Sequence, residues 1–126
     1  MKIVYNRLIP FPGFTAMNLF GVLFVRSEYK DLISEVTINH ESIHTAQMKE
    51  MLYIFFYIWY FIEWLIRLIF NTSTAYRSIS FEQEAYNNQL DFNYLKTRKK
   101  YSWLKHLKTR YPSIRQKQKQ LNQLNK

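Results

Sequence analysis

The N-terminal part of the chain has the pattern of short β-strands. Residues 1–6 partly alternate between apolar and polar side chains, and residues 19–26 are rich in β-branched and aromatic side chains, which suit a pleated sheet. Residues 10–13 contain two prolines and a glycine and are typical of a turn between such segments. We therefore expect a small N-terminal β-sheet.

The following residues have helical patterns. One helix is expected to begin within residues 30–35, with Ser34 or Thr37 as alternative starting points, and another to run from residue 79 to about residue 95. Between them, residues 51–70 are almost entirely apolar and predict one long helix. The predicted fold class is therefore α+β, a small sheet followed by helices.

The apolar segment of residues 51–70 is also amphipathic. At 100° per residue, one stripe holds most of its polar and hydroxyl-bearing side chains, namely Glu50, Tyr53, Tyr57, Tyr60, Trp64 and Arg67, with Glu63 at its edge. The opposite face holds Met51, Ile54, Phe55, Ile58, Ile62, Leu65, Ile66 and Ile69. The length of the segment matches a bilayer crossing, whereas the polar stripe is typical of a helix that packs on protein.

Charge is distributed unevenly along the chain. Residues 96–126 carry 11 of the 18 Lys and Arg residues and none of the nine acidic residues. We therefore divide the chain into a domain of residues 1–95 and a basic C-terminal tail of residues 96–126. This asymmetry indicates an anionic partner, either lipid headgroups or nucleic acid, or simply a solvated terminus.

Two absences in the sequence limit the chemistry. There is no cysteine, which excludes disulfides and thiolate metal ligands. The first residues are followed by Pro10 and Pro12 and lack a long apolar stretch, so we expect no signal peptide.

The strongest chemical signal is the sequence His40-Glu41-Ser42-Ile43-His44. On a helix, His40 and His44 lie one turn apart on the same face, so both rings can reach one zinc ion at about 2.0–2.1 Å. Glu41 can then take a proton from a metal-bound water. We therefore expect a zinc site in which Glu41 is the catalytic base.

A catalytic zinc site needs a third protein ligand. His106 lies in the basic tail, where the neighbouring lysines disfavour a cation. Glu82 and Glu84 are better candidates, but side chains two residues apart on a helix point about 200° away from each other. At most one of these two carboxylates can face the metal.

The motif at residues 40–44, followed by Glu82-Gln83-Glu84-Ala85, resembles the gluzincins, which are metallopeptidases with H-E-x-x-H on one helix and a zinc-binding Glu on a second. It is most similar to the membrane-linked branch with the CAAX prenyl proteases and HtpX-like heat-shock proteases, and to the soluble minigluzincins. The resemblance covers residues 34–90. It departs from the family at Tyr86, where Asp or Asn is usual.

This resemblance implies a zincin-like minimal core: a small sheet packed on the metal-site helix, a long apolar helix and a Glu-bearing helix. It implies zinc held by His40, His44 and Glu82. It also implies an edge strand along which an extended peptide substrate lies, and residues 19–26 are the candidate for that strand.

Two hypotheses nearly exclude each other: that Glu82 binds zinc together with His40 and His44, and that residues 51–70 cross a membrane completely. A crossing of about 30 Å puts His44 and Glu82 on opposite sides, and residues 71–81 are too short and too polar to return. We therefore expect the helix to pack on the core, with its outer surface in one leaflet or covered by a partner. A fully packed core helix is the alternative.

These features predict a small membrane-associated zinc metallopeptidase that acts on a peptide or protein at the cytoplasmic face, with a soluble cytoplasmic enzyme as the alternative. Tyr76 and Tyr86 are candidate donors to the oxyanion of the transition state. A second hypothesis is an inactive, zinc-stabilised scaffold or regulator. A third is binding of anionic lipid or nucleic acid through the basic tail, although no nucleic-acid motif is present. The oligomeric state stays open.

Overall fold

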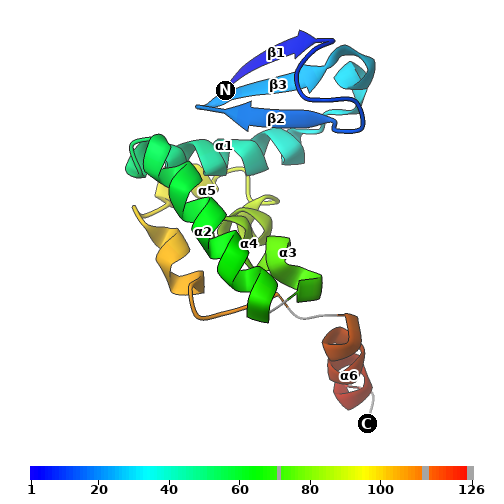
Figure 1. Ribbon diagram of the computed structural model, residues 1–126, viewed down its shortest axis with the longest axis vertical. Coiled ribbons are helices and arrows are strands. Elements are labelled where there is room, and N and C mark those ends of the chain that lie inside the picture. The colour runs from blue at the N-terminus through cyan, green and yellow to red at the C-terminus, as the bar shows by residue number, and fades with distance from the viewer. Residues whose placement is uncertain (71, 112–113, 125–126) are drawn as a thin grey trace.

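The computed structural model describes residues 1–70, 72–111 and 114–124, which form an α+β fold (Figure 1). Strands β1 (Lys2–Asn6), β2 (Ala16–Leu19) and β3 (Val22–Arg26) form a sheet in the order β1-β3-β2. Strand β1 runs parallel to β3, and β2 runs antiparallel to it. The expected small N-terminal sheet is therefore present.

The expectation of one strand over residues 19–26, serving as a sheet edge, is wrong. A two-residue turn divides the segment, because Phe20 and Gly21 both have positive φ, 51° and 89°. Strand β3 after the turn pairs with neighbours on both sides, so its backbone cannot receive a further strand. The edge strand on this side of the sheet is β2, where the Asn18 carbonyl oxygen accepts a hydrogen bond from the Tyr57 hydroxyl at 3.2 Å.

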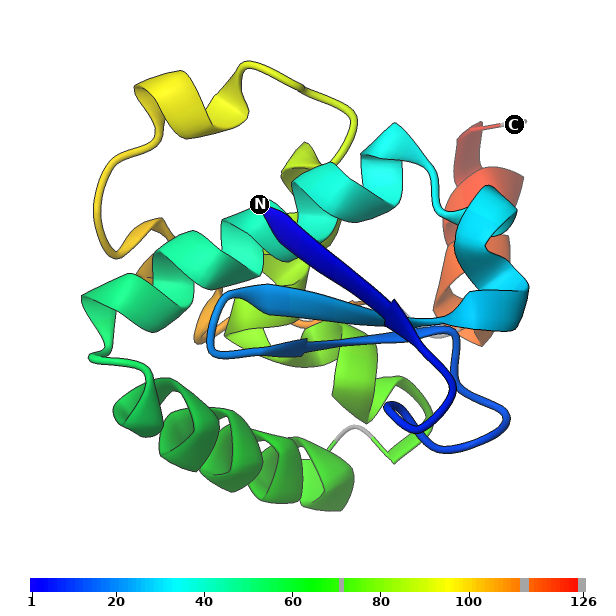
Figure 2. The same ribbon diagram turned by 90° about the horizontal axis from the view of Figure 1, so that it is seen from above.

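Helix α1 (Glu35–Glu50) lies against the sheet (Figures 1 and 2). Its N-cap is Ser34, whose Oγ accepts a hydrogen bond from the Thr37 backbone N–H. Of the two alternative starting points, Ser34 is therefore the observed one and Thr37 is not. The Asn18 side chain on β2 donates to the Glu41 carbonyl oxygen at 3.0 Å and joins the edge strand to this helix. A 3₁₀ turn, η1 (Ser27–Leu32), connects β3 to α1.

The predicted helix over residues 51–70 begins later than expected. Residues 51–53 form a turn in which Leu52 and Tyr53 adopt the left-handed conformation, and helix α2 (Ile54–Phe70) starts after it. This turn sets α1 and α2 at 109° to each other. Of the helices in the described part of the chain, none alone is long and apolar enough to cross a membrane, and only the bent pair α1 and α2 together meets that criterion.

The elements after α2 are short. They are η2 (Thr72–Thr74), α3 (Ala75–Ser78), α4 (Ser80–Asn88), α5 (Tyr94–Thr97), η3 (Ser102–His106) and α6 (Ile114–Leu124). The predicted helix over residues 79–95 is therefore wrong beyond Asn88. The Asn39 side chain donates to the carbonyl oxygens of Gln89 and Asp91, and this contact satisfies backbone groups where the chain leaves α4.

The main core lies below α1, where α2, α4 and η3 meet it (Figure 1). Its buried members are Met48, Phe56, Phe81 and Trp103 from these four elements, together with Ile79 just before α4. The tyrosine and tryptophan stripe packs against them, with Tyr53 of the preceding turn and Tyr57, Tyr60 and Trp64 of α2 partly buried. The stripe predicted from helical periodicity thus faces the protein.

Candidate metal centre

Three side chains from two helices converge in the interior. His40 and His44 come from α1 and Glu82 from the first turn of α4, and all three are between 3% and 7% exposed. Glu82 Oε1 lies 3.2 Å from His40 Nε2 and 3.0 Å from His44 Nε2, and the two Nε2 atoms are 3.1 Å apart. Ligand atoms around a tetrahedral zinc lie about 3.4 Å from one another, so this group can hold a metal ion.

The hydrogen bond on the other side of His44 decides which of its ring nitrogens carries the proton. His44 Nδ1 lies 2.8 Å from Gln47 Oε1. The Gln47 amide nitrogen donates to the Phe81 carbonyl and to Glu84 Oε1, both at 3.0 Å, so its oxygen must face the imidazole. Nδ1 is therefore the donor, and in the neutral ring Nε2 presents a lone pair to the centre.

His40 is held in the same way. Its Nδ1 lies 2.9 Å from Gln89 Oε1, just beyond the end of α4. The Tyr86 ring contacts the imidazole edge-on, with 4.4 Å between ring centroids. Tyr86 thus packs against the ligand ring at the position where the gluzincin motif has Asp or Asn, and Gln89 supplies the polar contact.

Three lone pairs directed at one point require a positive charge between them. Burial acts to lower the pKa of His44, but the Glu82 carboxylate outweighs it and raises the pKa to about 9. Burial acts in the opposite sense on Glu82, yet the two imidazoles hold the pKa of this carboxyl well below its usual range. The centre therefore attracts a cation, either a proton or a metal ion.

Glu84 faces away from the centre and supports it indirectly. Besides its bond to Gln47, its carboxylate pairs with Arg98 and accepts from the Tyr94 hydroxyl at 2.6 Å. Burial acts to raise the pKa of Glu84, but the hydrogen bond from Arg98 holds it below its usual range. Arg98 also pairs with Glu50 on α1, so a residue of the basic segment anchors the support of His44.

Sequence reasoning missed Arg98, Gln89 and Tyr60. The Tyr60 hydroxyl donates to Glu82 Oε2 at 2.7 Å, leaving Oε1 for the two histidines. Burial and then the Glu82 charge raise the pKa of Tyr60 and of Tyr76, so both hydroxyls stay protonated. Tyr60 belongs to the inward stripe of α2, and this periodicity could have identified it as a residue near the metal centre. No local sequence pattern indicates a role for Arg98 or Gln89.

His106 takes no part in the centre. It lies on η3, and burial together with Lys105 lowers its pKa. Its carbonyl oxygen accepts a hydrogen bond from Arg67 at 3.0 Å.

A cavity of about 190 Å³ opens beside two of the three candidate ligands, His44 and Glu82. Its walls include His44, Glu82, Glu41, Asn18 and Tyr60. Glu41 is half-buried there, and among the described residues no hydrogen bond or ion pair engages its carboxylate. The arrangement puts a free carboxylate, two ligands and the edge strand β2 around one small space.

Comparisons of the chain with protein-family models, with curated proteins and with solved structures found no match.

Proposed function

We propose that this chain is a small zinc metallopeptidase of the gluzincin type. His40, His44 and Glu82 would hold zinc, and Glu41 would act as general base. The observation that carries the proposal is the convergence of three lone-pair donors on a point beside a cavity lined by Glu41, whose carboxylate has no partner within the described part of the chain. Two imidazoles and a carboxylate, without a thiolate, are a usual donor set for catalytic zinc.

Zinc bound there would polarise a peptide carbonyl and make water more acidic. Glu41 would accept a proton from the attacking water and later deliver it to the leaving amine nitrogen as the C–N bond breaks. Tyr60 would keep Glu82 Oε2 occupied, so that Oε1 stays directed at the histidines.

An extended peptide would lie along β2, the edge strand, and not along β3 as first expected. Asn18 of β2 lines the cavity together with Glu41, which supports this track. Addition of a strand to this edge would bring a peptide backbone next to the zinc ligands.

A second candidate is a zinc-stabilised scaffold, favoured by the burial of all three ligands and by the network that ties them to Gln47, Gln89 and Arg98. In that case zinc would join α1 to α4 and Glu41 would have no catalytic task.

The Glu41→Gln variant separates the two candidates. The full chain should bind one zinc by elemental analysis and hydrolyse fluorescein-labelled casein. Glu41→Gln should keep the zinc and lose hydrolysis by about 10²–10⁴-fold, the usual contribution of a general base. Glu35→Gln, at an exposed position on the same helix, is the matched control and should keep full activity.

His44→Ala should lose the zinc. A wild-type chain without stoichiometric zinc would overturn both candidates. If zinc is bound but no hydrolysis depends on Glu41, the peptidase is overturned and the zinc-stabilised scaffold is the candidate that stands.

A further inference from the structure

One face of α2 is apolar and exposed along its whole length. Its side chains are between 39% and 75% exposed and are Ile54, Phe55, Ile58, Trp59, Phe61, Ile62, Leu65, Ile66, Ile69 and Phe70. We call these residues the α2 outer face. Monomeric soluble proteins rarely expose an apolar surface of this extent, and such surfaces mark contacts with a membrane or another protein.

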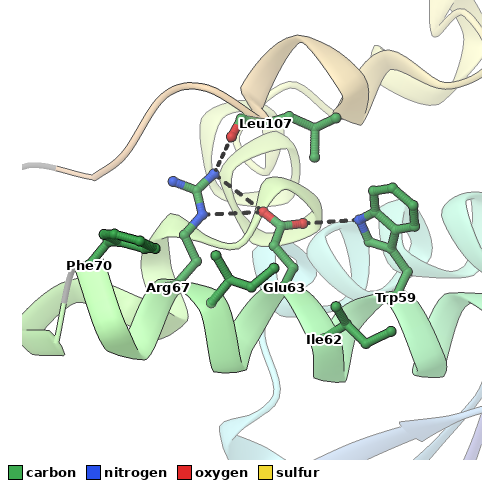
Figure 3. A pocket seen from close by; sticks show the side chains of 7 residues that line it. Trp59, Ile62, Glu63, Arg67, Phe70 and Leu107 are labelled. Atoms are coloured by element: carbon green, nitrogen blue, oxygen red, sulfur yellow. Dashed lines mark hydrogen bonds and ion pairs between the residues drawn. The ribbon is translucent and has the colours of Figure 1, made fainter.

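The charged groups of α2 are withdrawn from this face. Glu63 and Arg67 pair at 3.3 Å with side chains only 9% exposed, and Arg67 also donates to the Leu107 carbonyl oxygen (Figure 3). Arg67 donates to the Thr109 carbonyl oxygen as well. These bonds hold the segment after η3 along α2. Leu107 and Phe70 line a mostly apolar cavity of about 400 Å³ between the two elements, and the paired Glu63 and Arg67 side chains also line it.

The segment held by Arg67 lies beside the α2 outer face, where Leu107 shares a cavity with Ile66 and Phe70, and this segment carries positive charge. Leu104 and Leu107 are exposed there, and so are Lys105 and Lys108 between and beside them. Residues 96–126 contain no acidic residue. The border of the α2 outer face is therefore basic.

This charge discriminates between the two occupants that an apolar face could have. In a symmetric dimer through the α2 outer face, two copies of this basic segment would lie at one interface, and residues 96–126 supply no acidic residue to pair with them. An anionic bilayer accommodates both features, because apolar and aromatic side chains enter the acyl boundary while lysines meet lipid phosphates.

We propose that α2 lies in the plane of an anionic membrane, with the α2 outer face in one leaflet and Lys105 and Lys108 among the headgroups. Tyr57 and Tyr60, on the opposite side of the helix, line the cavity of the metal centre. Docking in this orientation leaves that cavity on the aqueous side of α2. The inference does not depend on zinc or on peptidase activity.

Sedimentation with lipid vesicles tests the proposal on the full chain. The protein should bind vesicles of phosphatidylcholine mixed with phosphatidylglycerol, and added salt or pure phosphatidylcholine should weaken binding. Ile62→Asp and Ile69→Asp should each weaken it about tenfold or more, since an apolar side chain no longer enters the leaflet. Leu8→Asp, at an exposed apolar position in the loop between β1 and β2, is the matched control and should bind as the wild type does.

Lys105→Ala and Lys108→Ala should each weaken vesicle binding about fivefold, as expected for one lysine near an anionic surface. Lys2→Ala, on the exposed side of β1, is the control for charge and should have no effect. His44→Ala should bind vesicles as the wild type does, so that a failure of the metal proposal remains distinguishable. Circular dichroism verifies that each variant is folded.

The orientation has its own readout, because the chain has no native cysteine. An environment-sensitive fluorophore on Ile62→Cys should shift to the blue on vesicles, whereas the same label on Asn87→Cys of α4 should not. A shift at both positions would overturn the in-plane orientation.

Three results would overturn the proposal as a whole. The first is a lack of binding to the mixed vesicles, and the second is binding that does not change with the lysine substitutions. The third is a dimer that Ile62→Asp abolishes, without vesicle binding.

Discussion

Two of the buried clusters of charged or titratable groups among the described residues differ in how their polar atoms are satisfied. In the first, Glu63 and Arg67 face each other with opposite charges. The Glu63 carboxylate also accepts from Trp59 Nε1 and from the backbone N–H of Ser80. Every strong donor in this cluster meets an acceptor, so the cluster is complete without any ligand.

In the second cluster, the protein supplies acceptors to a common point. His40 Nε2, His44 Nε2 and Glu82 Oε1 lie within 3.2 Å of one another, while the Nδ1 protons are engaged by Gln89 and Gln47. Burial is similar in the two clusters, and so burial alone does not distinguish a structural ion pair from a ligand site. The two clusters are distinguished by their hydrogen-bond donors: N–H groups of the protein point at the Glu63 carboxylate, whereas lone pairs converge between His40, His44 and Glu82.

The largest effect expected is on the complete cluster. Arg67→Met leaves the Glu63 carboxylate buried without its counter-ion and removes a donor from the carbonyl oxygens of Leu107 and Thr109. The free energy of unfolding in urea should fall by about 3–5 kcal/mol. Zinc should stabilise this variant as much as it does the wild type, because the cluster offers no ligand. Loss of the zinc-induced stabilisation would contradict the distinction between the two clusters.

An intermediate effect is expected where the basic segment supports the metal centre. Arg98→Met removes the cation that holds Glu84 against Gln47, and Gln47 in turn orients His44. Zinc affinity measured by competition with a chromophoric chelator should fall about 10–100-fold, which is typical for loss of an outer support of a ligand. Lys99→Met, at the adjacent exposed position, is the control. Equal zinc affinity in Arg98→Met and wild type would show that the network is not coupled to the centre.

The smallest effect, per pH unit, is on zinc binding itself. Because the pKa of His44 in the metal-free protein is about 9, a proton must leave before zinc binds. Zinc affinity should therefore rise about tenfold per pH unit from pH 6.5 towards 9 and level off above it.

The stability of the metal-free protein should change in the opposite direction. Its His44–Glu82 pair stabilises the fold fully below the ordinary His pKa of 6.5, and that contribution is lost as pH rises through about 9. Thermal denaturation of the metal-free chain across this range would measure it. A pH-independent zinc affinity would mean that no proton occupies the centre.

The parts of the fold that depend on periodicity were predictable from the sequence. The spacing of His40 and His44 places both on one face of any helix that contains them. The same geometry lets only one of Glu82 and Glu84 face that pair. The inward stripe of α2, from Tyr57 to Arg67, follows from the same periodicity, because a helix orients side chains every 3.6 residues whatever it packs against.

The remainder was decided by tertiary packing. Leu52 and Tyr53 adopt the left-handed conformation although neither is glycine, so the sequence does not indicate a turn there. They nevertheless follow the end of α1 and turn the chain so that α2 packs across α4. The edge position of β2, in place of β3, depends on which strand β1 joins. The end of α4 at Asn88 is accompanied by contacts from Asn39 in another helix.

The same reason applies to the candidate metal centre. Helical geometry alone determined that two histidines share a face, because their relation is local. Glu82 approaches His44 to 3.0 Å, and Gln89 and Arg98 support the centre through His40 and Glu50. Each of these contacts joins a residue of α1 to one that lies 38 to 49 positions later in the chain. Such contacts form only when the intervening elements are packed, since no local rule relates side chains at that separation.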